Sequence, residues 1–237
     1  MKHAQRGATL IVVLLVLLLI TIVGTFAIRK SMTSLNLISN QQINTLLVQS
    51  SDAAFLRFQN PADVGIHAAA TGIVSFLRNP ANQDKEVVFC FSGPAPFSLN
   101  NAGWFEESGQ IIKLASNGGA CTANDSSEGR HQVTTQVYMR RIAADPDEPF
   151  ADLARGTDVV GAKTETSLRL EMQVISVMNG LISDPDDLFD APDGCFHRSL
   201  EGQNNVIQCL KAHDVLYNAQ VAEYRFLSDF EPSGSQP

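Results

Sequence analysis

Cysteine is the most reactive side chain in this 237-residue sequence, and it occurs four times. The simplest pairing would close two disulfides, one between Cys90 and Cys121 and one between Cys195 and Cys209. Four cysteines allow three connectivities, so the sequence alone does not settle the pairing. We therefore expect disulfide chemistry at these positions and leave the connectivity open.

Zinc binding is the alternative chemistry around the second cysteine pair. Four nitrogen and sulfur ligands, the number that a tetrahedral zinc site requires, would come from Cys195, His197, Cys209 and His213. The spacings C-x-H and C-x3-H are not a familiar zinc pattern. We therefore rank a disulfide above zinc at this place.

An acidic stretch just before Cys195 is a second candidate cation site. Its carboxylates lie within residues 183–194 and are Asp184, Asp186, Asp187, Asp190 and Asp193. Clustered carboxylates suit a hard cation such as calcium. The EF-hand order is absent, because Leu188 and Phe189 stand where a ligand and a glycine are needed. We name the aspartates as calcium candidates, and the alternative is a solvated acidic turn.

The common motifs of enzyme active sites are missing from the sequence. H-E-x-x-H, G-x-S-x-G, G-x-x-x-x-G-K and G-x-G-x-x-G after a strand do not occur, and neither does C-x-x-C. We interpret the histidines as surface or packing residues: His3, His67, His131, His197 and His213. The sequence therefore predicts no enzyme activity.

Charge is distributed unevenly along the chain, whose formal net charge is −8. Residues 1–30 hold Lys2, Arg6, Arg29 and Lys30 and no acid, so the other 13 basic and 25 acidic residues give the remainder −12. Binding of nucleic acid needs a basic face. We therefore expect no nucleic-acid partner.

An uncharged stretch from Gly7 to Ile28 precedes all of these candidate sites and holds 22 residues. Roughly 20 apolar residues cross the hydrocarbon core of a bilayer as a helix, and a soluble amphipathic helix would need a polar face. A cleaved secretory signal would have a shorter apolar region and a small-residue cleavage site after it. Here Arg29 and Lys30 follow directly, so we predict a membrane helix.

The front of this stretch has the layout of a processing signal. Lys2, His3 and Arg6 make a short basic leader, Gly7 follows, and Ala8-Thr9-Leu10-Ile11 opens the apolar helix. This resembles the class III signal of type IV pilins and type II secretion pseudopilins, and RGATLIVVLLVLLLITIVG resembles the PilX N-terminal family more closely. In that family a prepilin peptidase cuts after the glycine and methylates the new amine. The resemblance implies cleavage between Gly7 and Ala8 and N-methylation of Ala8.

Two positions depart from the pilin pattern. The first mature residue, usually Phe or Met, is Ala8, and the fifth, normally Glu, is Val12. In pilins that Glu is thought to meet the amine of the subunit already in the filament, and an unpaired carboxylate in a bilayer is costly. The first subunit of a filament has no such neighbour. The resemblance therefore implies an initiating subunit. PilX-type minor pilins and K-type pseudopilins share this lack of an acid at the fifth position.

The resemblance also implies a location and partners. The chain would cross the inner membrane once, with its N-terminus inside, and then enter the extracellular pilus near its tip. Its partners would be the prepilin peptidase, other minor pilins and, as a further candidate, a tip adhesin. An oxidising compartment favours disulfides over zinc, and Cys195–Cys209 resembles the disulfide-bounded loop near the C-terminus of type IV pilins. K-type pseudopilins bind calcium, which supports the aspartate candidates.

The apolar stretch continues into a region that we expect to be one helix. Neither proline nor glycine occurs in residues 29–59, and apolar residues recur near helical spacing, with a polar set that includes Ser51 on the other side. We predict a helix from Ala8 to Gln59, roughly 75–80 Å long. Residues 1–7 would be the leader, 8–28 the transmembrane part and 29–59 the amphipathic part of this helix.

Residues 60–228 are expected to form an extracytoplasmic head, with one short helix at Ile66–Leu77. Alternation and β-branched content predict strands at Glu86–Phe91, Gln110–Leu114, Val133–Arg141, Ser167–Met178 and Val215–Leu227. Ala143–Gly161 reads as an acidic surface loop and residues 229–237 as a disordered tail. Turns rather than helices separate the strands, which favours an antiparallel sheet. The predicted fold class is α+β and pilin-like, with a long N-terminal helix packed on an antiparallel β-sheet.

The function that these patterns indicate is that of a minor pilin. It would help to initiate type IV pilus assembly, lie near the pilus tip with other minor pilins, and support piliation, twitching motility and adhesion. A K-type minor pseudopilin of a type II secretion system is one alternative, and neighbouring genes would distinguish it. A signal-anchored periplasmic enzyme is the other, and it would keep its N-terminus intact.

Overall fold

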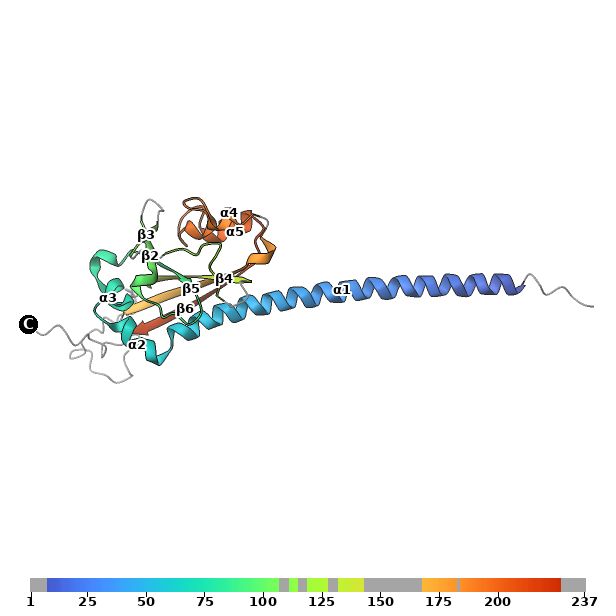
Figure 1. Cartoon of the computed structure of the whole chain (residues 1–237), viewed down its shortest axis with the longest axis horizontal. Helices are drawn as coiled ribbons and strands as arrows, with labels where there is room; N and C mark the ends of the chain where they lie inside the picture. The colour runs from blue at the N-terminus through green and yellow to red at the C-terminus, as the bar shows by residue number, and fades with distance from the viewer. Residues whose placement is uncertain are drawn as a thin grey trace, which may run out of the picture. The chain divides into compact units, whose positions relative to one another are not determined.

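The computed structural model describes residues 8–106, 111–114, 119–127, 132–142, 168–182 and 184–226. The chain forms two compact units, divided between Thr45 and Leu46. The predicted leader, the predicted acidic loop at 143–161 and the predicted disordered tail at 229–237 lie outside the described residues, so those three predictions stay predictions. Figure 1 shows the elements in chain order.

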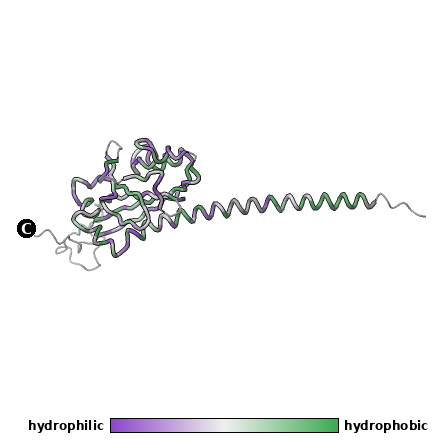
Figure 2. The backbone as a smooth tube through the Cα atoms, in the orientation of Figure 1, coloured by the Kyte–Doolittle hydropathy of each residue, from purple (hydrophilic) through white to green (hydrophobic). Residues whose placement is uncertain are grey.

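The first unit contains most of helix α1, which runs from Ala8 to Phe58. Its segment Leu10–Lys30 is long and apolar enough to cross a membrane, and none of its side chains is buried. Figure 2 shows this part as mostly hydrophobic. The Thr21 and Thr25 hydroxyls donate to the Leu18 and Ile22 carbonyls, each over 2.8 Å. The helix therefore satisfies its own polar groups, as a lipid environment demands.

The second unit is built on an antiparallel sheet in the order β3-β2-β1-β4-β5-β6. The described strands are β1 (Val87–Phe91), β2 (Ala102–Phe105), β3 (Ile111–Lys113), β4 (Val133–Ile142), β5 (Leu168–Met178) and β6 (Tyr217–Phe226). The predicted α+β class and the antiparallel arrangement are confirmed, and each predicted strand occurs. Strand β2 was not predicted, because Ala102 and Gly103 have weak strand propensity. Gly103 is needed there, since a Cβ would lie 2.7 Å from the Ile111 side chain.

Short helices surround the sheet in the described part of the chain. They are α2 (Pro61–Ala68), α3 (Ile73–Arg78), α4 (Asp186–Phe189) and α5 (Val206–Ala212), with 3-10 turns η1 (Pro80–Asn82), η2 (Leu99–Asn101), η3 (Asn179–Leu181) and η4 (Cys195–His197). The prediction of a single helix at Ile66–Leu77 is wrong. The helical structure is interrupted between α2 and α3, and at Gly72 any Cβ would lie 2.3 Å from the His67 carbonyl oxygen. Such a close turn admits only glycine.

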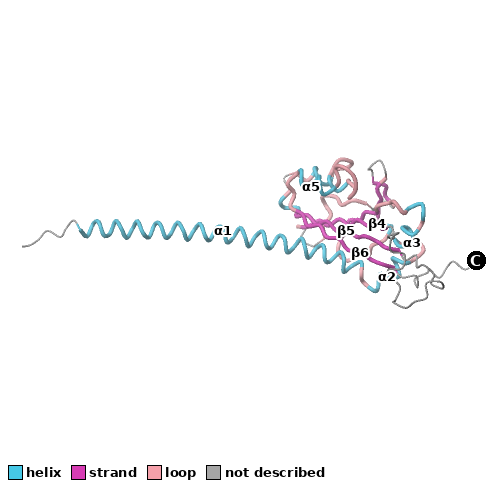
Figure 3. Tube along the Cα trace, turned by 180° about the vertical axis from the view of Figure 1, so that it is seen from behind, coloured by secondary structure: helices cyan, strands magenta, loops and turns pink. Residues whose placement is uncertain are grey.

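The two faces of the sheet carry different cores, as the alternation of side chains along a strand requires. On one face, Ala54 and Phe58 of α1 share a buried cluster with Phe89, Val137 and Met172. On the other face, α4, η4 and α5 cover a cluster that includes Tyr138 and Ile175. Figure 3 shows the sheet between these two layers. The head is therefore a three-layer arrangement of helix, sheet and disulfide-rich segment.

Hydroxyl groups join the last turns of α1 to the sheet. The Ser50 Oγ lies 2.7 Å from the Thr135 Oγ1, and the Ser51 Oγ lies 2.8 Å from the Ser176 Oγ and donates to the Asn218 side-chain oxygen over 3.1 Å. Thr135 and Ser176 also bond to each other over 2.8 Å. The expectation that Ser51 lies on the polar side of the helix is therefore wrong. Ser51 is fully buried. Its hydroxyl has partners on β5 and β6, and these hydrogen bonds offset the cost of burying it.

Candidate functional site

The N-terminal half of α1 is the first candidate site. Gly7 lies outside the described residues, and α1 begins at Ala8, the residue that would become the new N-terminus. Val12 is 60% exposed and lies among other exposed aliphatic side chains. The described side chains from Leu10 to Ile28 include no ionisable group. This surface can pack against lipid or against other apolar helices, and it offers no ion pair.

Two disulfides occur in the head, Cys90–Cys121 and Cys195–Cys209. These are the bridges of the simplest pairing given by the sequence. Both belong to the cluster on the sheet face opposite α1. The first joins β1 to the loop before β4, and the second joins η4 to α5. Covalent bonds therefore reinforce the face that has no long helix to cover it.

A buried glutamine connects the two disulfide-bonded segments. The Gln136 side-chain oxygen accepts from the Cys121 backbone N–H over 2.8 Å. Its Nε2 donates to the Phe196 carbonyl over 2.8 Å and to the Tyr138 hydroxyl over 2.6 Å. Burial raises the pKa of Tyr138 well above its ordinary value, so this hydroxyl stays neutral. One fully buried amide thus fixes both cross-linked loops against β4.

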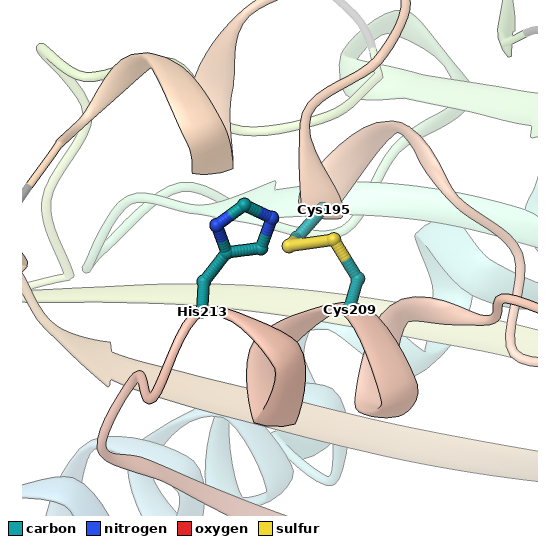
Figure 4. A group of neighbouring side chains, drawn as sticks. All are labelled: Cys195, Cys209 and His213. Carbon is teal, nitrogen blue, oxygen red and sulfur yellow. A yellow bond between two sulfur atoms is a disulfide. The ribbon is translucent and has the colours of Figure 1, made fainter.

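The structure has a disulfide at the place where the zinc alternative needs two thiolates. Figure 4 shows Cys195, Cys209 and His213 close together. The two sulfurs are bonded to each other and supply no thiolate, which is the form that binds zinc. The fourth candidate, His197, is not part of this group, and its Nε2 lies 3.2 Å from the Phe189 carbonyl. The His213 ring lies 2.9 Å from the Asp187 carboxylate instead.

The five aspartates of the acidic stretch all lie exposed around α4. They are Asp184, Asp186, Asp187, Asp190 and Asp193. Within the part of the chain that the structure describes, they do not form a group that could hold a metal ion. The Asp184 carboxylate accepts from the Asp186 backbone N–H over 3.1 Å, and Asp187 pairs with His213. Calcium binding at these residues stays a prediction.

Glu86 is a buried carboxyl group that the sequence did not reveal as special. Its oxygens accept from the Leu200 backbone N–H over 3.0 Å and from the Ser199 hydroxyl over 3.1 Å. Burial raises its pKa to about 7, although these two hydrogen bonds and nearby Arg140 act in the opposite direction. The Glu86 carboxyl therefore connects the segment after η4 to the start of β1. Its burial removes it from water, and this desolvation disfavours the charged form.

An open cleft of about 600 Å3 lies beside Glu86. Arg140 lines it and pairs with Glu171 over 2.8 Å and with Glu201. The Lys85 ammonium lies 4.0 Å from the centre of the Trp104 ring. The lining of the cleft therefore contains both acidic and basic side chains. This arrangement suits structural ion pairing.

The comparisons with known proteins bear on the N-terminal region. Residues 6–56 match the family model described as PilX N-terminal. Neither a curated protein nor a solved structure matches the chain. The matched residues include the Gly7–Ala8 junction, the apolar helix and most of the part of α1 that docks on the sheet. This match supports a type IV pilin of the PilX family, and the remainder of the head lies outside it.

Proposed function

We propose that this chain is a minor pilin of the PilX family that initiates type IV pilus assembly. A prepilin peptidase would cut between Gly7 and Ala8 and methylate Ala8. The subunit would wait in the inner membrane, N-terminus inside, and then enter the pilus near its tip. Other minor pilins, and as a further candidate a tip adhesin, would contact the head. Piliation, twitching motility and adhesion would depend on it, and it would carry out no catalysis.

The observation that carries this proposal is the uncharged N-terminal helix with Val12 at the fifth position after the cleavage junction. An acid at that position needs an amine partner, since an unpaired charge in a bilayer costs about 3 kcal/mol on insertion scales. A subunit that arrives first has no neighbour whose amine could pair with such an acid. The chain avoids this cost by having only aliphatic side chains there, and it can still present its own amine to the next subunit.

Processing is the direct test of the proposal. Mass spectrometry of the membrane-extracted protein should find the loss of residues 1–7 and the gain of one methyl group on Ala8. Gly7→Arg should abolish both changes and remove pili, because the peptidase requires glycine in this family. Gly24→Ala is the matched control, since a Cβ at Gly24 meets nothing within 4 Å. Normal pili in the Gly7→Arg strain would contradict the proposal.

The place in the assembly order is a separate prediction. Val12→Glu introduces an acid that a first subunit cannot pair, so we expect fewer pili or a changed order of subunits. Val12→Leu keeps the surface apolar and should behave as the parent chain does. Pilus counts by electron microscopy would measure both variants. Full complementation by Val12→Glu would remove the argument for initiation and leave the pilin assignment standing.

A K-type pseudopilin is the second candidate, and the same missing acid favours it. Deletion of the gene separates the two, because a pilus subunit affects surface filaments and a pseudopilin affects protein secretion. The family match to PilX supports the first.

A further inference from the structure

Two cysteines and a histidine converge at the second disulfide. Cys195 lies in η4, Cys209 lies in α5, and His213 follows Cys209 by four residues, which places both on one side of the helix. The two sulfur atoms and one ring nitrogen of His213 all lie within 4.8 Å of one another (Figure 4). Among the described residues, no such group includes Cys90 or Cys121. Within these residues, the second disulfide therefore differs from the first in having an imidazole beside it.

The imidazole of His213 is held in place by a carboxylate. Its Nδ1 lies 2.9 Å from the Asp187 carboxylate of α4, and Figure 4 shows the other ring nitrogen, Nε2, on the side of the sulfurs. A neutral imidazole that donates from Nδ1 has its lone pair on Nε2. Histidines that bind metals are commonly oriented in this way, by a carboxylate on the second nitrogen. The His213 ring therefore presents an electron pair toward the two sulfurs.

The oxidation state of the two sulfurs decides what this group can bind. Bonded to each other, they supply no thiolate. Every chain is synthesised with cysteine thiols, however, and the bond forms only when two electrons and two protons pass to an oxidant. Reduction by a dithiol reverses this step, because it breaks the S–S bond and leaves the reductant as a disulfide. Two thiols and an imidazole are then present at the same place.

Two thiolates and an imidazole form a ligand set that suits zinc, which prefers sulfur and nitrogen ligands in a tetrahedral arrangement. Ligand atoms on one tetrahedral zinc ion lie roughly 3.3–3.8 Å apart. The three donor atoms here lie within 4.8 Å of one another, so side-chain shifts of about 1 Å would bring them to zinc distances. The His213 and Asp187 side chains are 37% and 46% exposed. Water therefore reaches this side of the group and can supply the fourth ligand.

We propose that the head binds one zinc ion through Cys195, Cys209 and His213 when these two cysteines are reduced. The two thiol protons are released to water, both thiolates and the His213 Nε2 coordinate the ion, and a water molecule takes the fourth position. Asp187 is a positioning residue that keeps the proton of the imidazole on Nδ1. The disulfide and the zinc ion are thus alternative cross-links between η4 and α5. This inference goes beyond the proposed function and does not depend on it.

Cobalt is the probe for this site, because a thiolate bound to Co2+ gives a charge-transfer absorption that displacement by Zn2+ removes. The full chain in detergent micelles would be reduced with a phosphine under argon and titrated with Co2+ and then with Zn2+. The reduced chain should show this absorption at one equivalent, and the oxidised chain should not. His213→Asn should weaken zinc binding by more than about a hundredfold, and Asp187→Asn by about tenfold. Asp186→Asn, at an exposed acid of the same helix, is the matched control and should leave the affinity unchanged.

Three results would overturn the inference. They are a reduced chain without cobalt–thiolate absorption, zinc binding that His213→Asn leaves unchanged, and equal zinc affinities of Asp187→Asn and the parent chain. Where reduction unfolds the head, the fluorescence of Trp104 reports it, because this is the only tryptophan of the chain. Zinc should then restore the native fluorescence of the parent chain and not that of His213→Asn, because metal binding supplies folding free energy. A reduced parent chain that zinc fails to refold would equally overturn the inference.

Discussion

Two stretches of α1 share the helical backbone but differ in how their side chains are buried. Residues Leu10–Lys30 bury no side chain within the structure, whereas Leu47, Ser51, Ala54 and Phe58 near its other end are almost fully buried against the sheet. The first stretch needs only apolar character, so many aliphatic sequences would serve. The second needs particular shapes and hydroxyls at particular positions. Substitutions of the same kind should therefore be tolerated in the first stretch and destabilise the head in the second.

Measurement of this difference is straightforward, because Trp104 is the only tryptophan of the chain and lies in β2 of the head. Urea unfolding of the full chain in detergent micelles, followed by tryptophan fluorescence, reports on the head alone. Midpoints and slopes of these transitions give the free energy of unfolding.

The largest effect expected in the head is a pH dependence caused by Glu86. Its pKa is about 7 in the fold and 4.5 as the ordinary value, so the native state binds this proton more tightly than the unfolded state does. The contribution of this proton to the free energy of unfolding is fully present below pH 4.5. It falls by on the order of 3 kcal/mol as the pH rises to 7. Glu86→Gln should remove this slope. Glu201→Gln, at an exposed acid, should keep it, and equal slopes in the parent chain and Glu86→Gln would contradict the assignment.

Overpacking should give the next effect. Ala54 is completely buried, so Ala54→Leu should destabilise the head by about 2 kcal/mol. Ala27→Leu makes the same change in the exposed apolar stretch and should alter the unfolding free energy by less than about 0.5 kcal/mol. Equal effects of the two variants would break the distinction between the stretches.

Loss of a hydroxyl should give the smallest of the three effects. Ser51→Ala removes the contacts to Ser176 and Asn218 and should cost about 1–2 kcal/mol, because buried polar groups lose a partner. Thr25→Ala removes a hydroxyl that bonds only within its own helix turn and should leave the head unchanged. If Ser51→Ala is neutral, the hydroxyl contacts do not hold α1 to the sheet.

The sequence predicted the features that depend on neighbours along the chain. The apolar run, five of the strands and the antiparallel class follow from local periodicity and composition. The apolar members of the buried stripe of α1, Leu47, Ala54 and Phe58, follow from the same periodicity. The burial of Ser50 and Ser51 does not, because their partners are distant: Ser51 meets Ser176 after 125 residues. Glu86 was missed for the same reason, since Leu200 lies 114 residues away. Burial of a polar residue depends on such partners, and no single stretch of sequence contains them. The cleavage junction stays a prediction, since Gly7 lies outside the described residues.

The hydroxyl cluster between α1 and the sheet has a consequence for how the head responds to salt. Its members, on Ser50, Ser51, Thr135 and Ser176, carry no ionisable group, and each bond is a short neutral contact in a buried place. Dissolved ions screen exposed charges but leave such bonds almost untouched. The contact between α1 and the sheet should therefore be equally stable at low and at high ionic strength.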